Sequence, residues 1–423
     1  MKQTITGFAA LLLMLPTALH AAEPPHPQKN PGSPLMLGGN WVPEKSQEID
    51  FDKLPRVPSQ HVFISSVRAP GSSLTELDHK NGGVNQHNYL AHHNGKFWAM
   101  WSDGPGIEDR AGQRVTFATS ADGVKWNQPE YLTPLPRDCG PDSIHYNRRS
   151  RQGFRYIARG FWQRDGELLA LAALDEAAEF FGKSLELHAF RWKGADGPWE
   201  PVGIVFKDAI NNFPPKQLRT GEWLMSRRKH GYRETGAHFL IGGVEAIDQW
   251  ESFPVLGSNS KLKAEEPEWW VLPDEKNLMA LFRDNNGSGF LHRAFSTDDG
   301  RTWSEPVRTN FPDATSKISG LRLSDGRYAL VSNAHPRKRD PLVLSLSDDG
   351  MVFTKMLSLV GDRWVDYPHL IEHDGQLYIA FAGGKQSVEL LEVSLKELDQ
   401  LKMPETPLQG PPLPKPAPKP KKP

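Results

Sequence analysis

The sequence predicts an all-β, single-domain β-propeller over residues 36–400, and two observations support this prediction. A turn motif that ends in a large aromatic side chain recurs along the chain, with that side chain at Trp126, Trp199, Trp250, Trp303 and Phe353. The intervals are 73, 51, 53 and 50 residues, and a period near 50 residues with strand-like flanks is typical of a four-stranded blade. Six apolar, strand-like segments, each after a turn that carries Gly or Asn, give a count of six blades.

Residues 1–22 precede the predicted domain and have the pattern of a signal peptide. Lys2 is followed by the apolar run GFAALLLMLPTAL, and small residues offer a cleavage site after Ala21 or Ala22. The run is too short to span a bilayer with its flanks, so a membrane anchor is the weaker alternative. We therefore expect a secreted or periplasmic protein with no membrane span.

The segment HVFISSV, residues 61–67, is strand-like and lies before the first repeat. We expect it to supply the last strand of the final blade, because closing the ring in this way removes an exposed sheet edge. Cys139 is the only cysteine, so no intrachain disulfide is possible. Stability must then come from core area and from ring closure.

The most complete copy of the turn motif is STDDGRTW, which ends at Trp303. Ser296 and Asp298 can accept backbone N–H bonds inside the turn, and Gly300 can adopt a positive φ. Trp303 is expected to pack between blades. We interpret the motif as structural rather than as a calcium site or a catalytic carboxylate.

The last segment, residues 401–423, alternates Pro and Lys in a pattern that neither helix nor sheet accommodates. Its composition predicts a disordered, solvated, basic tail.

The chain of 423 residues has a formal net charge of -1, yet its basic residues concentrate on one predicted face. In a blade, the start of the inner strand and the turn between the second and third strands lie on one face, opposite the recurring turns. A basic mouth favours an anionic ligand, of which a carboxylated or sulfated sugar fits an exported propeller better than nucleic acid does. The basic residues of this face are Arg227, Arg228, Lys229, Arg233, Arg283, Lys317, Arg337, Lys338, Arg339 and Lys385.

The richest polar stretch is NQHNY at the start of the first predicted inner strand. Buried polar side chains there need partners, either in the protein or in a ligand. We predict one pocket near the propeller axis that holds Gln86, His87, Arg283, Lys317, Tyr367 and His369. Asn85, Arg227 and Arg337 complete the predicted substrate-binding set. The sequence contains no HExxH or CxxC motif, and we expect neither a metal nor a cofactor.

The motif STDDGRTW matches the Asp-box, S-x-D-x-G-x-T-W, of sialidases and related propellers. The stretches NQHNY, ISGLRLSDGRYALVSN and VDYPHLIEHDGQLYIAFAGGKQ also resemble secreted propellers of glycoside hydrolase family 145. That resemblance implies removal of α-L-rhamnose linked to glucuronic acid. It implies that Gln86 and His87 match the family's Gln–His pair, with the histidine catalytic, and that the propeller has seven blades.

Four functions are compatible with these residues. The first is a monomeric exo-acting glycosidase on a uronic-acid-containing glycan, with His87 as acid/base and Gln86 orienting it. The second is a polysaccharide lyase, in which the basic mouth neutralises the uronate carboxylate. The third is a sialidase, which needs three arginines, a Tyr–Glu nucleophile pair and an Asp acid. The fourth is a propeller that binds glycans without turnover. We expect the first.

Overall fold

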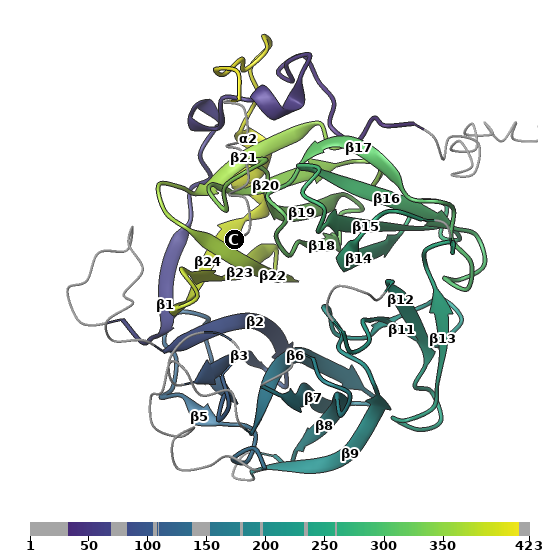
Figure 1. Cartoon of the computed structure of the whole chain (residues 1–423). Coiled ribbons are helices and arrows are strands. Elements are labelled where there is room, and N and C mark those ends of the chain that lie inside the picture. Colours follow the sequence, from purple (N-terminus) through teal and green to yellow (C-terminus); the bar gives the residue numbers. More distant parts are fainter. Residues whose placement is uncertain are drawn as a thin grey trace, which may run out of the picture.

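The computed structural model describes residues 33–68, 83–104, 108, 110–137, 153–177, 181–194, 198–231, 236–258 and 260–413. These residues form six four-stranded antiparallel sheets, which stand in a ring with β2, β6, β14, β18 and β22 nearest the centre (Figure 1). The count of six blades from the repeats is confirmed. The seven blades implied by the resemblance to family 145 are wrong for this chain, because all the strands of the described residues are used in six sheets.

Five blades take their strands in chain order from the centre outward, and the sixth takes β22, β23 and β24 and then β1. Blades one to three contain β2 (Val84–His93), β3 (Lys96–Gly104), β4 (Arg114–Ser120) and β5 (Glu130–Tyr131), then β6 (Phe154–Arg164), β7 (Glu167–Glu176), β8 (Glu186–Trp192) and β9 (Trp199–Lys207), then β10 (Lys216–Gln217), β11 (Trp223–Arg227), β12 (His238–Gly242) and β13 (Trp250–Pro254). Blades four to six contain β14 (Ala264–Val271), β15 (Leu278–Asp284), β16 (Phe290–Ser296) and β17 (Val307–Pro312), then β18 (Ser319–Arg322), β19 (Tyr328–Asn333), β20 (Leu342–Ser347) and β21 (Lys355–Val360), then β22 (Val365–His373), β23 (Gln376–Gly383), β24 (Ser387–Ser394) and β1 (Gln60–Ser66).

The N-terminal strand closes the ring, as predicted. β1 pairs antiparallel with β24, from Gln60 opposite Glu392 to Ser66 opposite Ser387. The blade formed by β22, β23 and β24 therefore takes its outermost strand from the other end of the chain. This pairing joins the two ends of the propeller, so that no blade is left with an unpaired fourth position.

A buried ion pair supports this closure. Arg363 donates to both Glu389 oxygens, at 2.7 and 2.6 Å. His61 of β1 lies 2.7 Å from Glu389 through its Nε2. Burial by itself would raise the pKa of Glu389, but the hydrogen bonds from Arg363 and His61 outweigh it and lower that pKa to about 2. The carboxylate is thus much more favourable in the folded chain than in water.

We expect Glu389→Gln to reduce the free energy of unfolding by roughly 3 kcal/mol at pH 7, since each unit of pKa shift corresponds to about 1.4 kcal/mol. Because the folded pKa lies below the ordinary value of 4.5, this stabilisation is present above that value and is lost as the pH falls toward 2. Urea unfolding of both proteins between pH 7 and pH 3 measures the effect. A stability difference that does not shrink on acidification would contradict the assignment.

The Asp-box turn has the structural role expected of it. The Ser296 hydroxyl accepts the Gly300 N–H at 2.9 Å, and Asp298 accepts the Thr302 N–H at 2.9 Å. Gly300 has φ +85°, and an added Cβ would lie 2.6 Å from a methyl of Leu224 in the preceding blade. Trp303 packs on Phe239 with ring centroids 5.0 Å apart. The turn therefore locks one blade against the previous one.

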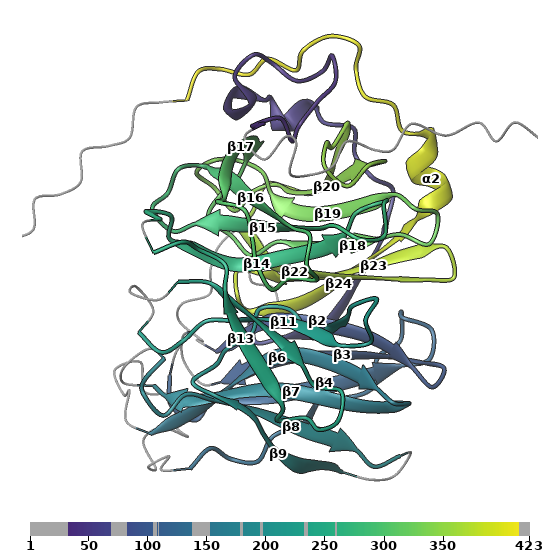
Figure 2. The same cartoon turned by 90° about the vertical axis from the view of Figure 1, so that its right-hand side faces the viewer.

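The two ends of the described chain cross the same end of the molecule (Figure 2). The short helices η2 (Ser46–Glu48) and η3 (Phe51–Lys53) belong to the first segment, and α2 (Leu395–Gln400) leads into the second. Leu408 is 8% exposed, and its N–H donates to the Trp41 carbonyl at 2.7 Å. Leu408 thus anchors the segment of residues 401–413, in which most of the other side chains are exposed or half-buried. Residues 414–423 and the predicted signal peptide, 1–22, lie outside the described residues.

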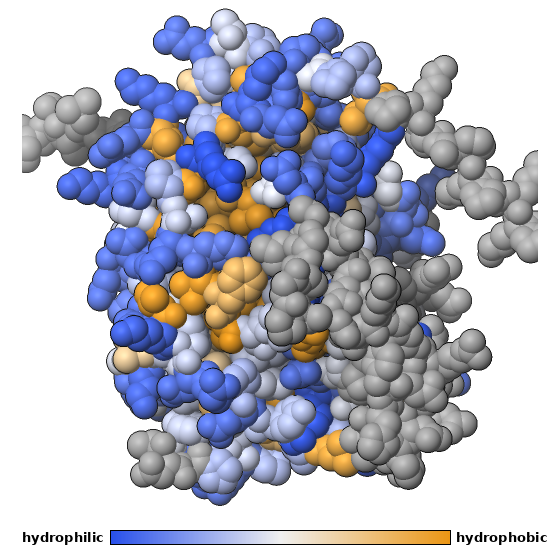
Figure 3. Space-filling view, turned by 90° about the vertical axis from the view of Figure 1, so that its left-hand side faces the viewer, coloured by the Kyte–Doolittle hydropathy of each residue, from blue (hydrophilic) through white to orange (hydrophobic). Residues whose placement is uncertain are grey.

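The rim that carries β1 shows groups of hydrophobic side chains among hydrophilic ones (Figure 3). Phe63, on this outermost strand, is one of the exposed large hydrophobic residues. Within the described ranges, no helix is long and apolar enough to cross a bilayer.

Candidate active site

The site is built on an irregularity that three inner strands share. The pairing of β2, β14 and β22 with the next strand of each blade shifts register between Gln86 and Tyr89, Glu265 and Glu268, and Asp366 and His369. Inside these bulges His87, Glu266 and Tyr367 have φ values of 56°, 42° and 55°. A left-handed backbone at a residue other than Gly is strained and tends to occur where function requires it. Each of the three bulges re-aims one side chain toward the propeller axis.

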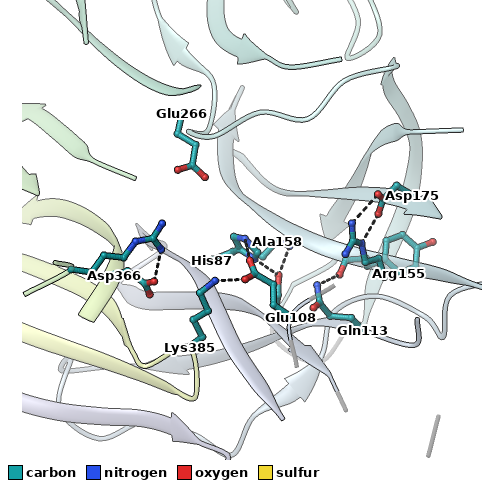
Figure 4. A network of polar contacts seen from close by, with 12 residues as sticks. His87, Glu108, Gln113, Arg155, Ala158, Asp175, Glu266, Asp366 and Lys385 are labelled. Carbon is teal, nitrogen blue, oxygen red and sulfur yellow. Dashed lines mark hydrogen bonds and ion pairs between the residues drawn. The ribbon is translucent and has the colours of Figure 1, made fainter. Parts of the chain in front are cut away.

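His87 is held from behind by a hydroxyl. Its Nδ1 lies 3.1 Å from the Ser102 Oγ, and that oxygen accepts the Ala158 N–H at 3.0 Å. The other ring nitrogen, Nε2, is 3.9 Å from a Glu108 oxygen. Figure 4 shows His87, Glu108, Lys385 and the Glu266 carboxylate around one space. The Nε2 atom of His87 therefore faces this space near the propeller axis, the axial site.

The surroundings keep the His87 imidazole neutral. Its pKa lies well below the usual range, first because the ring is buried and then because Arg159, Lys385 and Lys317 are close. In the free protein the ring is thus a proton acceptor. A bound anion that offset these cations would raise the pKa again.

Tyr367 contacts His87 edge to face, with ring centroids 4.7 Å apart. Burial, followed by the negative charges of Glu108 and Glu266, raises the pKa of Tyr367 well above its usual value. Burial also opposes ionisation of Glu266, but the neighbouring cations Arg283 and Arg228 outweigh it, so the pKa of Glu266 is lowered. A protonated phenol and an ionised carboxylate therefore line the same space.

Cations line the axial site, and four of them have acid partners there. The ion pairs are Arg228 with Glu265, Arg283 with Glu266, Arg339 with Asp366 and Lys385 with Glu108. Among the described residues, Arg159 and Lys317 form no ion pair, although they are only 3% and 4% exposed. The Lys317 Nζ lies over the Tyr89 ring at 4.1 Å. Buried cations without an acid partner are costly, so this arrangement favours a bound anion.

Of the predicted site residues, the structure brings His87, Arg283, Lys317 and Tyr367 to the axial site. Gln86 is buried beside them. Its amide forms no hydrogen bond of ordinary geometry with described residues, yet it is close enough to Glu108 to help lower the pKa of that carboxyl.

The other predicted residues have different surroundings. His369 accepts the Leu90 N–H at 3.1 Å, and Asn85 accepts from the Ser65 hydroxyl at 2.9 Å, so both hold adjacent blades together. Arg227 is directed away from the axis, because its guanidinium binds Asp208 and Ser252. Arg337 lies in the loop beyond β19, at cavities lined by the N-terminal segment.

Sequence reasoning did not select Glu266, Glu108 or Arg159 as site residues. Glu266 carried a detectable signal, since EEPEWW places two acids at the start of an inner strand, as NQHNY and VDYPHL place polar residues in β2 and β22. Arg159 was missed because it lies among apolar residues in the inner strand β6 and carries no comparable signal. Trp269 and Trp270 of β14 are buried between blades.

Among the described residues, no group of three or more His, Cys, Asp or Glu side chains is arranged to hold a metal ion. The side chains described above offer proton transfer, charge stabilisation and anion binding.

The fold is a six-bladed propeller that resembles the propellers of sialidases. A family model described as BNR repeat-like domain matches residues 204–379. No curated protein sequence matches the chain.

Solved structures that resemble it include several sialidases. One, described as a sialidase, has a TM-score of 0.55 at 19% identity, and the match covers 86% of this chain and 35% of the sialidase chain. The NanB sialidase of Streptococcus pneumoniae has a TM-score of 0.59 at 11% identity, with 79% and 71% covered. A Trypanosoma rangeli sialidase in complex with 2,3-difluorosialic acid has a TM-score of 0.60 at 14% identity, with 82% and 60% covered. This chain thus spans about a third of the first structure's length, and the likeness at these identities is one of fold.

Proposed function

We propose that this protein is an exported, exo-acting glycoside hydrolase that cleaves a bond next to a carboxylated sugar. The observation that carries the proposal is the pair of buried cations, Arg159 and Lys317, which have no acid partner in the described chain and lie close enough to His87 to lower its pKa. A uronate carboxylate supplies the missing negative charge.

Binding of the carboxylate couples recognition to chemistry. Because Arg159 and Lys317 depress the pKa of His87, an anion placed between them raises that pKa toward neutrality. The imidazole can then accept a proton from the attacking water and return it to the departing oxygen, while the Gln86 amide orients the reacting groups. On this basis, and on the resemblance to family 145, the preferred substrate is a terminal α-L-rhamnose linked to glucuronic acid in a plant or algal polysaccharide.

A second candidate is supported by Glu266 and Tyr367, which occupy equivalent bulges in β14 and β22. In sialidase-type chemistry a tyrosine attacks the sugar while a carboxylate accepts its proton, and arginines bind the substrate carboxylate. Arg283 and Arg339 are placed near this pair, since both influence the pKa of Tyr367. The acidic sugar would then be the one released.

The test incubates the purified protein separately with rhamnosyl-α-1,4-glucuronate and with sialyllactose, and it measures free rhamnose, free sialic acid and the ultraviolet absorbance of an unsaturated uronate. We expect free rhamnose without absorbance. Free sialic acid would favour the second candidate, and absorbance would assign the protein to the lyases. Binding of either glycan without any product would leave a propeller that only binds.

A further inference from the structure

A cavity lies beside the axial site, between blades five and six. It has a volume of about 750 Å³ and is lined in part by Arg337, Lys338, Arg339, Arg363, Trp364 and Lys385. Arg339 and Lys385 also belong to the axial site, where they lie 5.9 and 5.8 Å from the Tyr367 ring. This cavity therefore adjoins the axial site through a wall of shared cations.

Trp364 is an unusual residue in this wall. It is 44% exposed, and it is the only one of the 13 tryptophans among the exposed large hydrophobic residues. Its Nε1 donates to the Asp366 carboxylate at 3.0 Å, and Arg339 donates to the same oxygen at 2.7 Å. Because Asp366 is fully buried, these bonds fix an apolar ring at the surface. Fixed, exposed aromatic rings present low-entropy contact surfaces to ligands.

The charges around Trp364 are mostly positive. Arg339 and Arg363 are held by Asp366 and Glu389, so their positions are defined. Lys338 has no ion pair among the described residues and can turn its ammonium to a ligand. Two acids, Asp340 and Asp362, also line the cavity, but five basic residues outnumber them.

We infer that this cavity binds a second sugar of the glycan chain, one that carries a carboxylate, next to the sugar held at the axial site. Its ring contacts Trp364 while its carboxylate meets Lys338 and Arg339. The identity of the glycan rests on the proposed function, but binding of a sugar in this cavity does not depend on turnover.

Isothermal titration with glucuronic acid and with its linear oligomers of two to four sugars tests the inference. In the wild type we expect the oligomers to bind about tenfold more tightly than the monosaccharide, since a ring contact with a charged hydrogen bond supplies about 1.4 kcal/mol or more. Trp364→Ala should remove this gain and leave the affinity for glucuronic acid itself unchanged. Lys338→Gln should remove part of the gain.

Tyr131→Ala is the matched control, because Tyr131 is also an exposed aromatic ring beside an arginine, with Arg114 at 3.6 Å, but it lies on outer strand β5. The gain with length should persist in this variant. Trp364→Phe keeps a ring without the indole N–H and serves if the Ala variant does not fold, with an intermediate gain expected.

The inference would be overturned if the oligomers bound the wild-type protein no more tightly than the monosaccharide does. It would also be overturned if Trp364→Ala weakened the binding of all lengths equally. The two proposals fail separately. A length-dependent gain without hydrolysis refutes only the proposed function, and hydrolysis without a length-dependent gain refutes only the second sugar site.

Discussion

Replacing His87 with Ala is expected to lower kcat/KM on rhamnosyl-glucuronate by about two to four orders of magnitude, the usual range for a lost general acid or base. The fold should survive, because the side chain contributes one hydrogen bond, to Ser102, and one ring contact, to Tyr367. Steady-state kinetics and thermal unfolding of the same preparations measure both effects.

His93→Ala is the control for this variant. His93 lies at the other end of β2 and contacts Gln163, so its removal should leave the kinetics unchanged. Equal activity of His87→Ala and the wild type would remove His87 from the mechanism and direct attention to Tyr367 and Glu266.

The pH profile gives a second reading of the His87 role. In the free protein burial and nearby cations hold the pKa of His87 well below its usual range, so the base form persists into acid. The profile of kcat/KM reports the free enzyme and that of kcat the complex. The bound carboxylate raises the pKa of His87. As the pH is lowered, we therefore expect kcat to decline at a higher pH than kcat/KM does.

The blades could be predicted from sequence because their signals are local. Ser296, Asp298, Gly300 and Trp303 act within one turn, so their spacing survives in each repeat. Ring closure by residues 61–67 followed from the cost of an open edge. The number of blades was correct from the repeats and wrong from the family resemblance, because a motif shared among propellers does not determine how many blades close a ring.

The axial site was only partly predictable, for two physical reasons. Neighbouring residues of a strand point to opposite sides, so Arg228 reaches Glu265 near the axis while Arg227 turns to Asp208. A shift of one residue in a strand assignment exchanges such partners. In addition, His87 and Glu266 have positive φ values, which their residue types do not predict.

Arg159 and Lys317 have no acid partner among the described residues, and replacing both, as R159M/K317M, is expected to weaken binding of the carboxylated sugar by about 10²- to 10⁴-fold. Each lost charged hydrogen bond corresponds to about 1.5–3 kcal/mol, and every 1.4 kcal/mol is tenfold in affinity. Titration with glucuronic acid measures the loss directly, without any need for turnover.

The same substitution should make the free protein more stable, since two buried charges without acid partners are replaced by apolar side chains of similar length. Lys216→Met is the control. Lys216 is paired with the buried Glu268 and donates to the Trp269 carbonyl at 3.1 Å, so its loss leaves an uncompensated carboxylate and should lower stability while affinity is unchanged. If the two side chains served only to pack the core, their replacement would lower the stability of the protein. Suppose that R159M/K317M unfolds more readily than the wild type and binds glucuronic acid with the same affinity. The two cations then serve the fold, and the anion site at the propeller axis does not exist.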